Sequence, residues 1–189
     1  SVGDDQLAVD EARRFYRQNK ASTEAAYMYV DTLRGVGQLE EAKQLLKRLV
    51  DKEPDRLPHR AYLADLLAQQ SDPQGSGRVL DSVLAAEPNY VPAMLLKAEM
   101  LKKAGRIEAA LDVTGRIQSI RPNDMQAAWL AGDLYLLSGD HEAAVNSYRI
   151  AYPRVRGRYL IANMVDAYRT SQGDAEALLF LGSHLSRYP

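Results

Sequence analysis

Cysteine is absent from the 189-residue chain, which excludes disulfide bonds and thiolate metal sites. No apolar run approaches the roughly 18 residues that a membrane-spanning helix needs. The formal net charge of −1 lacks the basic excess that nonspecific binding to nucleic acid or anionic membranes requires. We therefore expect no nucleic-acid partner and no membrane contact by this segment itself.

Motifs for catalysis are also lacking. The three histidines, His59, His141 and His184, lie far apart, and none has a second histidine at metal-ligand spacing. His141-Glu142 begins like a zinc-protease motif, but no histidine stands four residues after His141. The Gly75–Gly77 segment lacks the third glycine and the preceding strand of a phosphate loop. We expect no enzymatic activity, no metal and no cofactor.

A repeat is the strongest feature that the chain does contain. Three prolines, Pro54, Pro88 and Pro122, follow one another at intervals of 34 residues. Alignment on these prolines brings small residues, a turn residue and large apolar residues into register. The small columns are Val30, Ala64, Ala98, Gly132 and Ala42, Ser76, Ala110, Ala144; the turn column is Gly37, Ser71, Gly105, Gly139; the large apolar column is Leu33, Leu67, Leu101, Tyr135. Such a period predicts a stack of similar supersecondary units.

Each unit is expected to contain two helices. In the first full unit, apolar residues at helical spacing predict a helix from about Glu24 to Val36, a turn at Gly37-Gln38, and a second helix from about Leu39 to Lys52. Pro54 then ends the second helix, because proline cannot continue the backbone hydrogen bonds. The pattern predicts an all-α chain with no strands.

The pattern resembles the tetratricopeptide repeat (TPR) family. That family has 34-residue helix–turn–helix units with a small residue late in the first helix, another early in the second, and a closing proline. The best-matched stretch is residues 128–151, where family positions are occupied by Gly132, Tyr135, Gly139, Ala144, Tyr148 and Ala151. The resemblance implies an α-solenoid of antiparallel helix pairs in a right-handed superhelix, with about 11 helices, that acts as a non-catalytic protein–protein interaction scaffold.

The register divides residues 1–189 into a single array. Residues 1–22 form a lone second helix of a partial repeat, and residues 159–189 form an irregular fifth repeat. Four full repeats lie between them, at 23–56, 57–90, 91–124 and 125–158. Pro153 stands three residues before the expected position, so Pro153–Tyr159 is predicted to interrupt the regular superhelix. The final helix, from Ala175 to Arg187, is too apolar for a capping helix, so we expect the segment to be part of a longer protein.

An acid follows the small residue of each first helix, and it is predicted to face a concave groove. Four positions before these acids stand the aromatic or apolar residues Tyr27, Ala61, Leu95 and Trp129. The predicted ligand-groove residues are Tyr27, Asp31, Asp65, Leu95, Glu99, Trp129 and Asp133. One interpretation is that this row binds a basic or amide-rich segment of a protein or peptide, with Tyr27 and Trp129 as anchors. The alternative is a solvated face, because Asp31 can pair with Arg34, and Glu99 with Lys102 or Lys103. Trp129 can equally pack between repeats.

Two further expectations concern anions. The best-known ligand mode of the family, a cationic clamp for a C-terminal carboxylate, should be absent, because acids occupy the relevant column. The basic cluster Arg154, Arg156 and Arg158 is a candidate site for an anion or an acidic partner. A solvated loop is the alternative for this cluster.

A finer resemblance concerns the cellular setting. The runs LAGDLYLLSGDHEAAVNSYRIAY and LFLGSHLSRYP are similar in style to TPR-repeat lipoproteins of bacterial exopolysaccharide (exosortase, PEP-CTERM) systems. This resemblance implies a periplasmic, lipid-anchored parent, whereas composition alone fits either cytoplasm or periplasm. Two functions remain open: a scaffold that binds an extended or helical partner segment in the groove, and a periplasmic glycan-contacting module of a polysaccharide export system.

Overall fold

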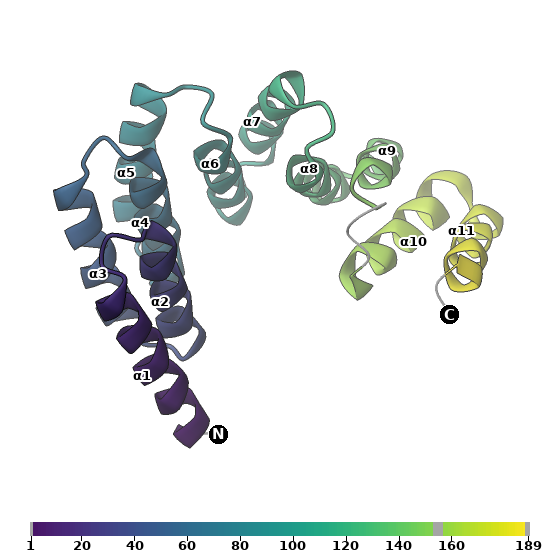
Figure 1. The fold of residues 1–189 in the computed structure, drawn as a ribbon. Helices are drawn as coiled ribbons and strands as arrows, with labels where there is room; N and C mark the ends of the chain where they lie inside the picture. Colours follow the sequence, from purple (N-terminus) through teal and green to yellow (C-terminus); the bar gives the residue numbers. More distant parts are fainter. Residues whose placement is uncertain (1, 153–156, 188–189) are drawn as a thin grey trace. The chain divides into compact units, whose positions relative to one another are not determined.

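The computed structural model describes residues 2–152 and 157–187. Within these ranges the chain forms eleven α-helices and no strand (Figure 1). The all-α fold and the helix count predicted from the repeat are therefore confirmed. None of the helices in the described ranges is both long enough and apolar enough to cross a bilayer.

The chain divides into two compact units, residues 1–88 and residues 89–189. The helices of unit 1 are α1 (Val2–Gln18), α2 (Thr23–Gly35), α3 (Leu39–Lys52), α4 (Leu57–Gln69) and α5 (Pro73–Ala86). Those of unit 2 are α6 (Val91–Lys103), α7 (Ile107–Ile120), α8 (Met125–Ser138), α9 (His141–Ala151), α10 (Arg158–Gln172) and α11 (Asp174–Arg187). The division of the whole chain into one array of four full repeats and two partial ones stays a prediction.

Within each unit, every helix packs against the next helix in the chain. In unit 2, α8 also contacts α6 and α10, so successive first helices of the predicted repeats lie side by side there. Figure 1 shows the paired helices of each unit running back and forth, joined by short turns. This is the stacking of helix hairpins that a solenoid requires.

The turn column predicted from the sequence is confirmed. Gly37, Gly105 and Gly139 have positive φ angles of 79°, 71° and 82°, and Ser71 has a φ angle of 60°. A left-handed residue reverses the chain after a helix, and glycine adopts this conformation without the steric cost of a Cβ atom. In the second predicted repeat, Ser71 adopts the same conformation despite the steric cost of its Cβ atom.

The helix ends also follow the sequence. Helices α3, α5 and α7 end at Lys52, Ala86 and Ile120, each two residues before one of the repeated prolines. Asp72 caps α5, because its side chain accepts a hydrogen bond of 2.8 Å from the Gly75 amide. A Cβ atom at Gly75 would collide with the Asp72 carboxylate, so this glycine makes room for the cap.

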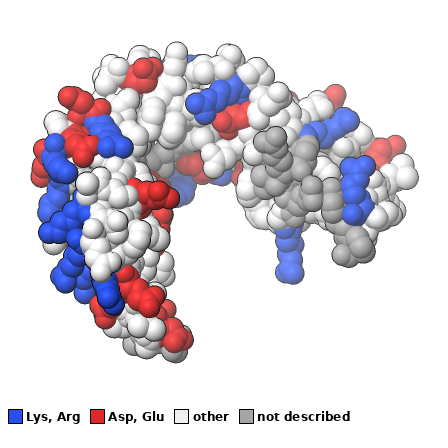
Figure 2. All heavy atoms as spheres, in the orientation of Figure 1, with Lys and Arg blue, Asp and Glu red and all other residues white. Residues whose placement is uncertain are grey.

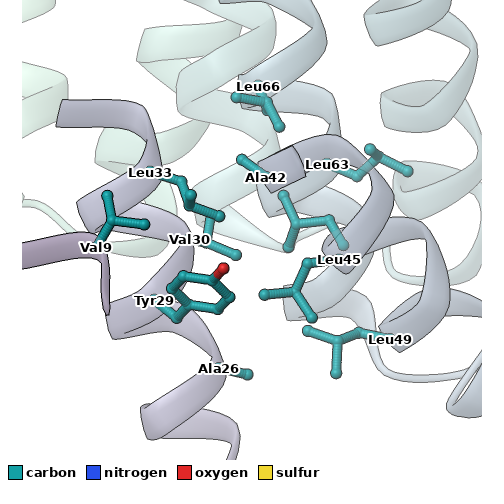
Figure 3. Close-up of a cluster of buried hydrophobic side chains, with 11 residues drawn as sticks. Val9, Ala26, Tyr29, Val30, Leu33, Ala42, Leu45, Leu49, Leu63 and Leu66 are labelled. Carbon is teal, nitrogen blue, oxygen red and sulfur yellow. The ribbon is translucent and has the colours of Figure 1, made fainter. Parts of the chain in front are cut away.

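The core of unit 1 lies where α2, α3 and α4 meet, with Val9 of α1 at its edge (Figure 3). Its buried residues are Ala26, Tyr29, Val30, Leu33, Ala42, Leu45, Leu46, Leu49, Leu63 and Leu66. The leucines fill the space between helices, while the small residues Ala26 and Ala42 let the backbones approach. Most of the stabilisation of this unit is expected from this apolar burial.

Unit 2 contains two such clusters. One joins α6 and α7 to α8 through residues that include Ala98, Ala110 and Leu134. The other joins α8 and α9 to α10, and Tyr148 is its largest fully buried side chain. The Tyr148 ring lies directly against Gly132 of α8, which explains why this position carries glycine while the other repeats carry alanine or valine.

We expect Gly132→Ala to destabilise unit 2. An added Cβ atom would lie 2.8 Å from Cζ of Tyr148 and closer still to Cε1 and Cδ1, so the buried ring must shift. Overpacking of this kind costs about 1–3 kcal/mol. Urea unfolding followed by far-UV circular dichroism measures the change.

Gly115→Ala in α7 is the matched control. Apart from its two chain neighbours and the backbone of its own helix, no atom lies within 4 Å of a Cβ atom built at Gly115. Because alanine favours the helix over glycine by up to about 1 kcal/mol, this variant should be as stable as the parent chain or more stable. Equal stability of the two variants would contradict the proposed packing of Tyr148 on Gly132.

Candidate functional site

The four predicted acids lie on the first helices of the predicted repeats: Asp31 on α2, Asp65 on α4, Glu99 on α6 and Asp133 on α8. Their side chains are not equally accessible. Asp31 is 60% exposed and Glu99 is 41% exposed, whereas Asp65 is 35% and Asp133 only 13% exposed. The first acid of each unit is therefore the one that solvent reaches best.

In unit 1, Arg34 of α2 joins two of these acids. Its guanidinium lies 3.6 Å from Asp31 on its own helix and 2.7 Å from Asp65 on α4. Arg34 also donates to Gln69 at 3.2 Å and lies over the Tyr62 ring, 5.3 Å from its centroid. No base stands three or four residues from Asp65 in its own helix, but Arg34 from the preceding helix pair compensates its charge.

In unit 2, Lys102 of α6 likewise joins two of the acids. Its ammonium group lies 3.3 Å from Glu99 on its own helix and 3.2 Å from Asp133 on α8. Burial opposes the charged form of this lysine, but the two carboxylates together raise the pKa of Lys102 above its ordinary value. The within-helix pairs expected from the sequence, Asp31–Arg34 and Glu99–Lys102, are present, and each base has a second partner on the next first helix.

The bridging bases occur in every second predicted repeat. Arg34 and Lys102 stand three residues after an acid in the first and third repeats, whereas Ala68 and Leu136 take that place in the second and fourth. The acids are predictable from the sequence column, whereas this alternation was not predicted. The surface is of mixed charge, and Figure 2 shows acidic and basic side chains beside one another at several places on the visible face.

Aromatic side chains connect α2 and α4 along the same surface. The Tyr62 hydroxyl donates to Asp31, and the Tyr27 hydroxyl forms a hydrogen bond of 2.7 Å with Nδ1 of His59. The Tyr27 and Tyr62 rings are in contact, with centroids 4.8 Å apart. Burial and the neighbouring Asp31 carboxylate raise the pKa of Tyr62. Tyr27 and Asp31 are thus both bonded to the neighbouring helix.

Asp133 is the most enclosed acid, and side chains of three other helices reach it. Besides Lys102 of α6, it accepts a hydrogen bond of 2.7 Å from the Tyr148 hydroxyl of α9 and one of 3.4 Å from Asn163 of α10. Burial and the nearby Asp133 carboxylate raise the pKa of Tyr148. This carboxylate therefore holds four helices of unit 2 together.

The remaining predicted groove residues have different surroundings. Trp129 of α8 is half-buried and packs against the cluster shared by α8, α9 and α10, with its ring centroid 6.3 Å from that of Tyr159. Leu95 of α6 is half-buried. Trp129 therefore does pack between helix pairs, which was the alternative to a ligand anchor. Whether these residues contact a ligand stays a prediction.

The predicted anion cluster is only partly within the described ranges. Arg154 and Arg156 lie outside the described residues, while Arg158 is exposed at the start of α10 and lines a groove between α10 and α11. In the described part of the chain, no group of three or more His, Asp or Glu side chains is placed to hold a metal ion.

His59, the histidine of unit 1, is fully buried. Burial lowers its pKa below the ordinary value, although Glu53, whose carboxylate lies 3.8 Å from Nε2, acts in the opposite direction. The neutral ring accepts or donates one hydrogen bond to Tyr27 at the contact of α2 and α4. A proton on His59 should weaken that contact.

Comparison with known proteins agrees with the helix stacking. Residues 67–131 match the family model of the tetratricopeptide repeat. No curated protein sequence matches the chain significantly. The predicted resemblance to tetratricopeptide repeats is confirmed, while the finer resemblance to exopolysaccharide lipoproteins stays a prediction.

Several solved structures share the fold. MamA residues 41 to the end from Desulfovibrio magneticus has 20% identity and a TM-score of 0.69, over 86% of this chain and 93% of that one. A thermophilic TPR protein of Thermus thermophilus has 17% identity and a TM-score of 0.69, over 89% and 92%. PilF of Pseudomonas aeruginosa has 16% identity and a TM-score of 0.72, over 91% and 74%. At these identities the likeness concerns the fold alone.

We expect Asp133→Asn to destabilise unit 2 far more than Glu99→Gln. The amide at position 133 would leave Lys102 without its second carboxylate and would weaken the bonds from Tyr148 and Asn163 in a largely buried site, at a cost of about 1–3 kcal/mol. Glu99 is more exposed, so its loss should cost less than about 1 kcal/mol. Urea unfolding of the two isosteric variants checks this, and equal costs would contradict the role of Asp133.

Acidification should destabilise unit 1 through His59. Because the folded-state pKa is lowered, the unfolded chain binds a proton first as the pH falls below about 6.5. Stability is therefore full above pH about 7 and decreases toward lower pH, by at most about 1.4 kcal/mol per pH unit for one proton. The free energy of unfolding measured at pH 7.5 and 5.5 should show a smaller difference in His59→Gln than in the parent chain.

The control for this experiment is His141→Gln at the start of α9, which should keep the pH dependence of the parent chain. If His59→Gln and His141→Gln behave alike, His59 does not account for the loss of stability in acid.

Proposed function

We propose that the chain is a non-catalytic protein–protein interaction scaffold that binds a partner segment on the face formed by its first helices. The tetratricopeptide-repeat match and fold support a protein–protein scaffold, since such repeats generally bind other proteins rather than catalyse reactions. We propose in addition where the partner binds: on the face of α2 and α4 in unit 1, and on the face of α6 and α8 in unit 2.

The observation that supports this face most directly is the unequal exposure of its acids. Asp65 and Asp133, the less exposed acids, form ion pairs with Arg34 and Lys102, respectively. Asp31 and Glu99 remain accessible at 60% and 41% exposure. A lysine or arginine of a partner would therefore meet Asp31 in unit 1 and Glu99 in unit 2, while Asp65 and Asp133 serve the internal structure.

The accessible acid of unit 1 is held in place before a partner arrives. Tyr62 donates to Asp31 from α4, and Arg34 lies 3.6 Å from it on the same helix. A side chain that is already ordered loses less conformational entropy when it binds. The neighbouring Arg34 also has N–H donors. A partner segment with amide groups can accept hydrogen bonds from Arg34, while its basic side chains pair with the acids on either side.

A periplasmic glycan-contacting module is the second candidate. The observation in its favour is the exposed ring of Tyr159, which lies beside Trp129 with centroids 6.3 Å apart. Aromatic faces and nearby carboxylates are groups that bind sugars. The setting in a bacterial exopolysaccharide or secretion assembly, with a lipid-anchored parent, is proposed from the sequence resemblance alone.

Peptide binding should depend on the two accessible acids. The probe is a fluorescein-labelled decapeptide of alternating asparagine and lysine, titrated at 0.15 M salt and followed by fluorescence anisotropy. We expect the double variant Asp31→Asn, Glu99→Gln to bind it at least about fivefold more weakly, because both accessible carboxylates lose their charge. The double variant Asp51→Asn, Asp112→Asn, with the same change of net charge on exposed acids of α3 and α7, should bind normally.

Calorimetry with anionic and cationic oligosaccharides separates the two candidate functions. Binding of the peptide without any sugar binding at millimolar concentration would exclude the glycan module. Equal losses in the two double variants would show that net charge, rather than the face of the first helices, attracts the peptide.

A further inference from the structure

Exposed basic side chains gather on the second halves of α1 and α3 in unit 1. Figure 2 shows basic side chains that follow one another along the left edge of this unit, where Figure 1 places α3 and α1. The residues of this basic band are all exposed: Arg14 and Arg17 of α1, Lys20 in the turn after α1, and Lys47 and Arg48 of α3. The first-helix face of the proposed function lies on other helices of the unit, α2 and α4.

One side chain links α1 to α3. Arg13 of α1 donates a hydrogen bond of 2.7 Å to the Tyr29 hydroxyl of α2 and pairs with Glu41 of α3 at 3.2 Å. Both α1 and α3 pack on α2, and because successive helices run back and forth, α1 and α3 run in the same direction. The bases that follow Arg13 and Glu41 along the two helices therefore lie toward the same end of unit 1.

The band residues differ from the other bases of α1 and α3 in their ion pairs. Arg13, Lys43 and Lys52 each lie within 4 Å of a carboxylate. No residue of the band has a carboxylate oxygen within 4 Å among the described residues. Lys47 acts on Glu40 only from a distance, because the pKa of Glu40 is lowered first by its hydrogen bond from Lys43 and least by Lys47. The positive charges of the band are thus left for solvent or a partner.

The helix dipole accounts for only part of the band. A base in the last turn stabilises the C-terminal end of a helix, and Arg17 and Lys52 stand there in α1 and α3. Arg14, Lys47 and Arg48 lie before those last turns. Like charges on one surface repel each other, so the band opposes folding slightly until counter-ions or a partner supply negative charge.

The charge of the rest of the chain decides which anion fits the band. The formal net charge is −1, and the acids Asp51, Glu53 and Asp55 stand at the end of α3 and just after it. A long nucleic acid or an anionic membrane surface would meet these acids as well as the bases. A short acidic segment can place its carboxylates on the band alone, and each arginine can hold a carboxylate through two N–H donors.

We propose that the basic band of α1 and α3 binds an acidic segment of a second protein partner. The inference goes beyond the proposed function, in which Asp31 and Glu99 receive the bases of a first partner. A scaffold with both surfaces carries separate residues for a basic segment and for an acidic one. Variants of the band leave the accessible acids unchanged, so the two surfaces are testable independently.

Fluorescence anisotropy with a labelled acidic peptide tests the band. The probe is a fluorescein-labelled decapeptide of alternating glutamate and serine, titrated with the whole chain. We expect a dissociation constant in the micromolar to millimolar range at about 0.05 M salt, and at least about threefold weaker binding at about 0.3 M salt, because salt screens exposed charges. The double variant Arg17→Gln, Arg48→Gln should bind at least about fivefold more weakly, because one base of each helix loses its charge.

The matched control removes two exposed arginines of unit 2. Arg106→Gln, Arg149→Gln changes the net charge by the same amount and should bind the acidic peptide like the parent chain. The double variant Arg17→Lys, Arg48→Lys keeps both charges and should retain most of the binding. Far-UV circular dichroism verifies that each variant keeps its helix content.

The variants of the proposed function separate the two surfaces. Asp31→Asn, Glu99→Gln should bind the acidic peptide at least as well as the parent chain, while Arg17→Gln, Arg48→Gln should bind the asparagine–lysine peptide normally. Failure of the asparagine–lysine peptide alone would refute the proposed function and leave the basic band standing. Failure of the acidic peptide alone would do the reverse.

Four results would overturn the proposed acidic partner. The first is no binding of the acidic peptide at about 1 mM protein and low salt, where screening is weakest. The second is an equal loss in the Arg17→Gln, Arg48→Gln variant and its matched control. The third is a dimer in sedimentation velocity that Arg17→Gln, Arg48→Gln dissociates, because a second copy would then cover the band. The fourth is tighter binding of single-stranded RNA or phosphatidylserine vesicles that the same variant weakens.

Discussion

Each unit depends on the stacking of one helix pair upon the next. A helix pair buries part of its apolar surface internally, and the first helix of the following pair contributes side chains to the same buried cluster. Small residues such as Ala98 and Ala110 make this approach possible, since a larger side chain at these fully buried positions would separate the helices. The turn residues with positive φ also support this packing, because they reverse the chain direction within a few residues and so bring the two helices of a pair together.

Ion pairs follow this stacking and do not replace it. Arg34 and Lys102 lie at the edge of the apolar contacts, and each links the acid of its own helix to the acid of the covering helix. Such pairs contribute modestly to stability when exposed, but they select which helix fits a groove, because a like charge at the same place is repelled. One base therefore serves both the packing of the unit and the choice of a neighbour.

The proposed binding face arises from this arrangement. On the first-helix face, the bridging base satisfies the buried acid and leaves Asp31 or Glu99 accessible. A base that joins two acids thus leaves one acid of each unit accessible.

The sequence by itself determined the helices, their turns and the small-residue contacts, since proline spacing, positive-φ positions and apolar periodicity are local properties. It also identified one acid in each first helix of the four full repeats: Asp31, Asp65, Glu99 and Asp133. It did not reveal that Arg34 reaches Asp65, or that Tyr148 and Asn163 reach Asp133. Those contacts join residues about 15 to 31 positions apart. The tertiary structure decided them, because they depend on how helices stack and on which side chains are long enough to cross the gap.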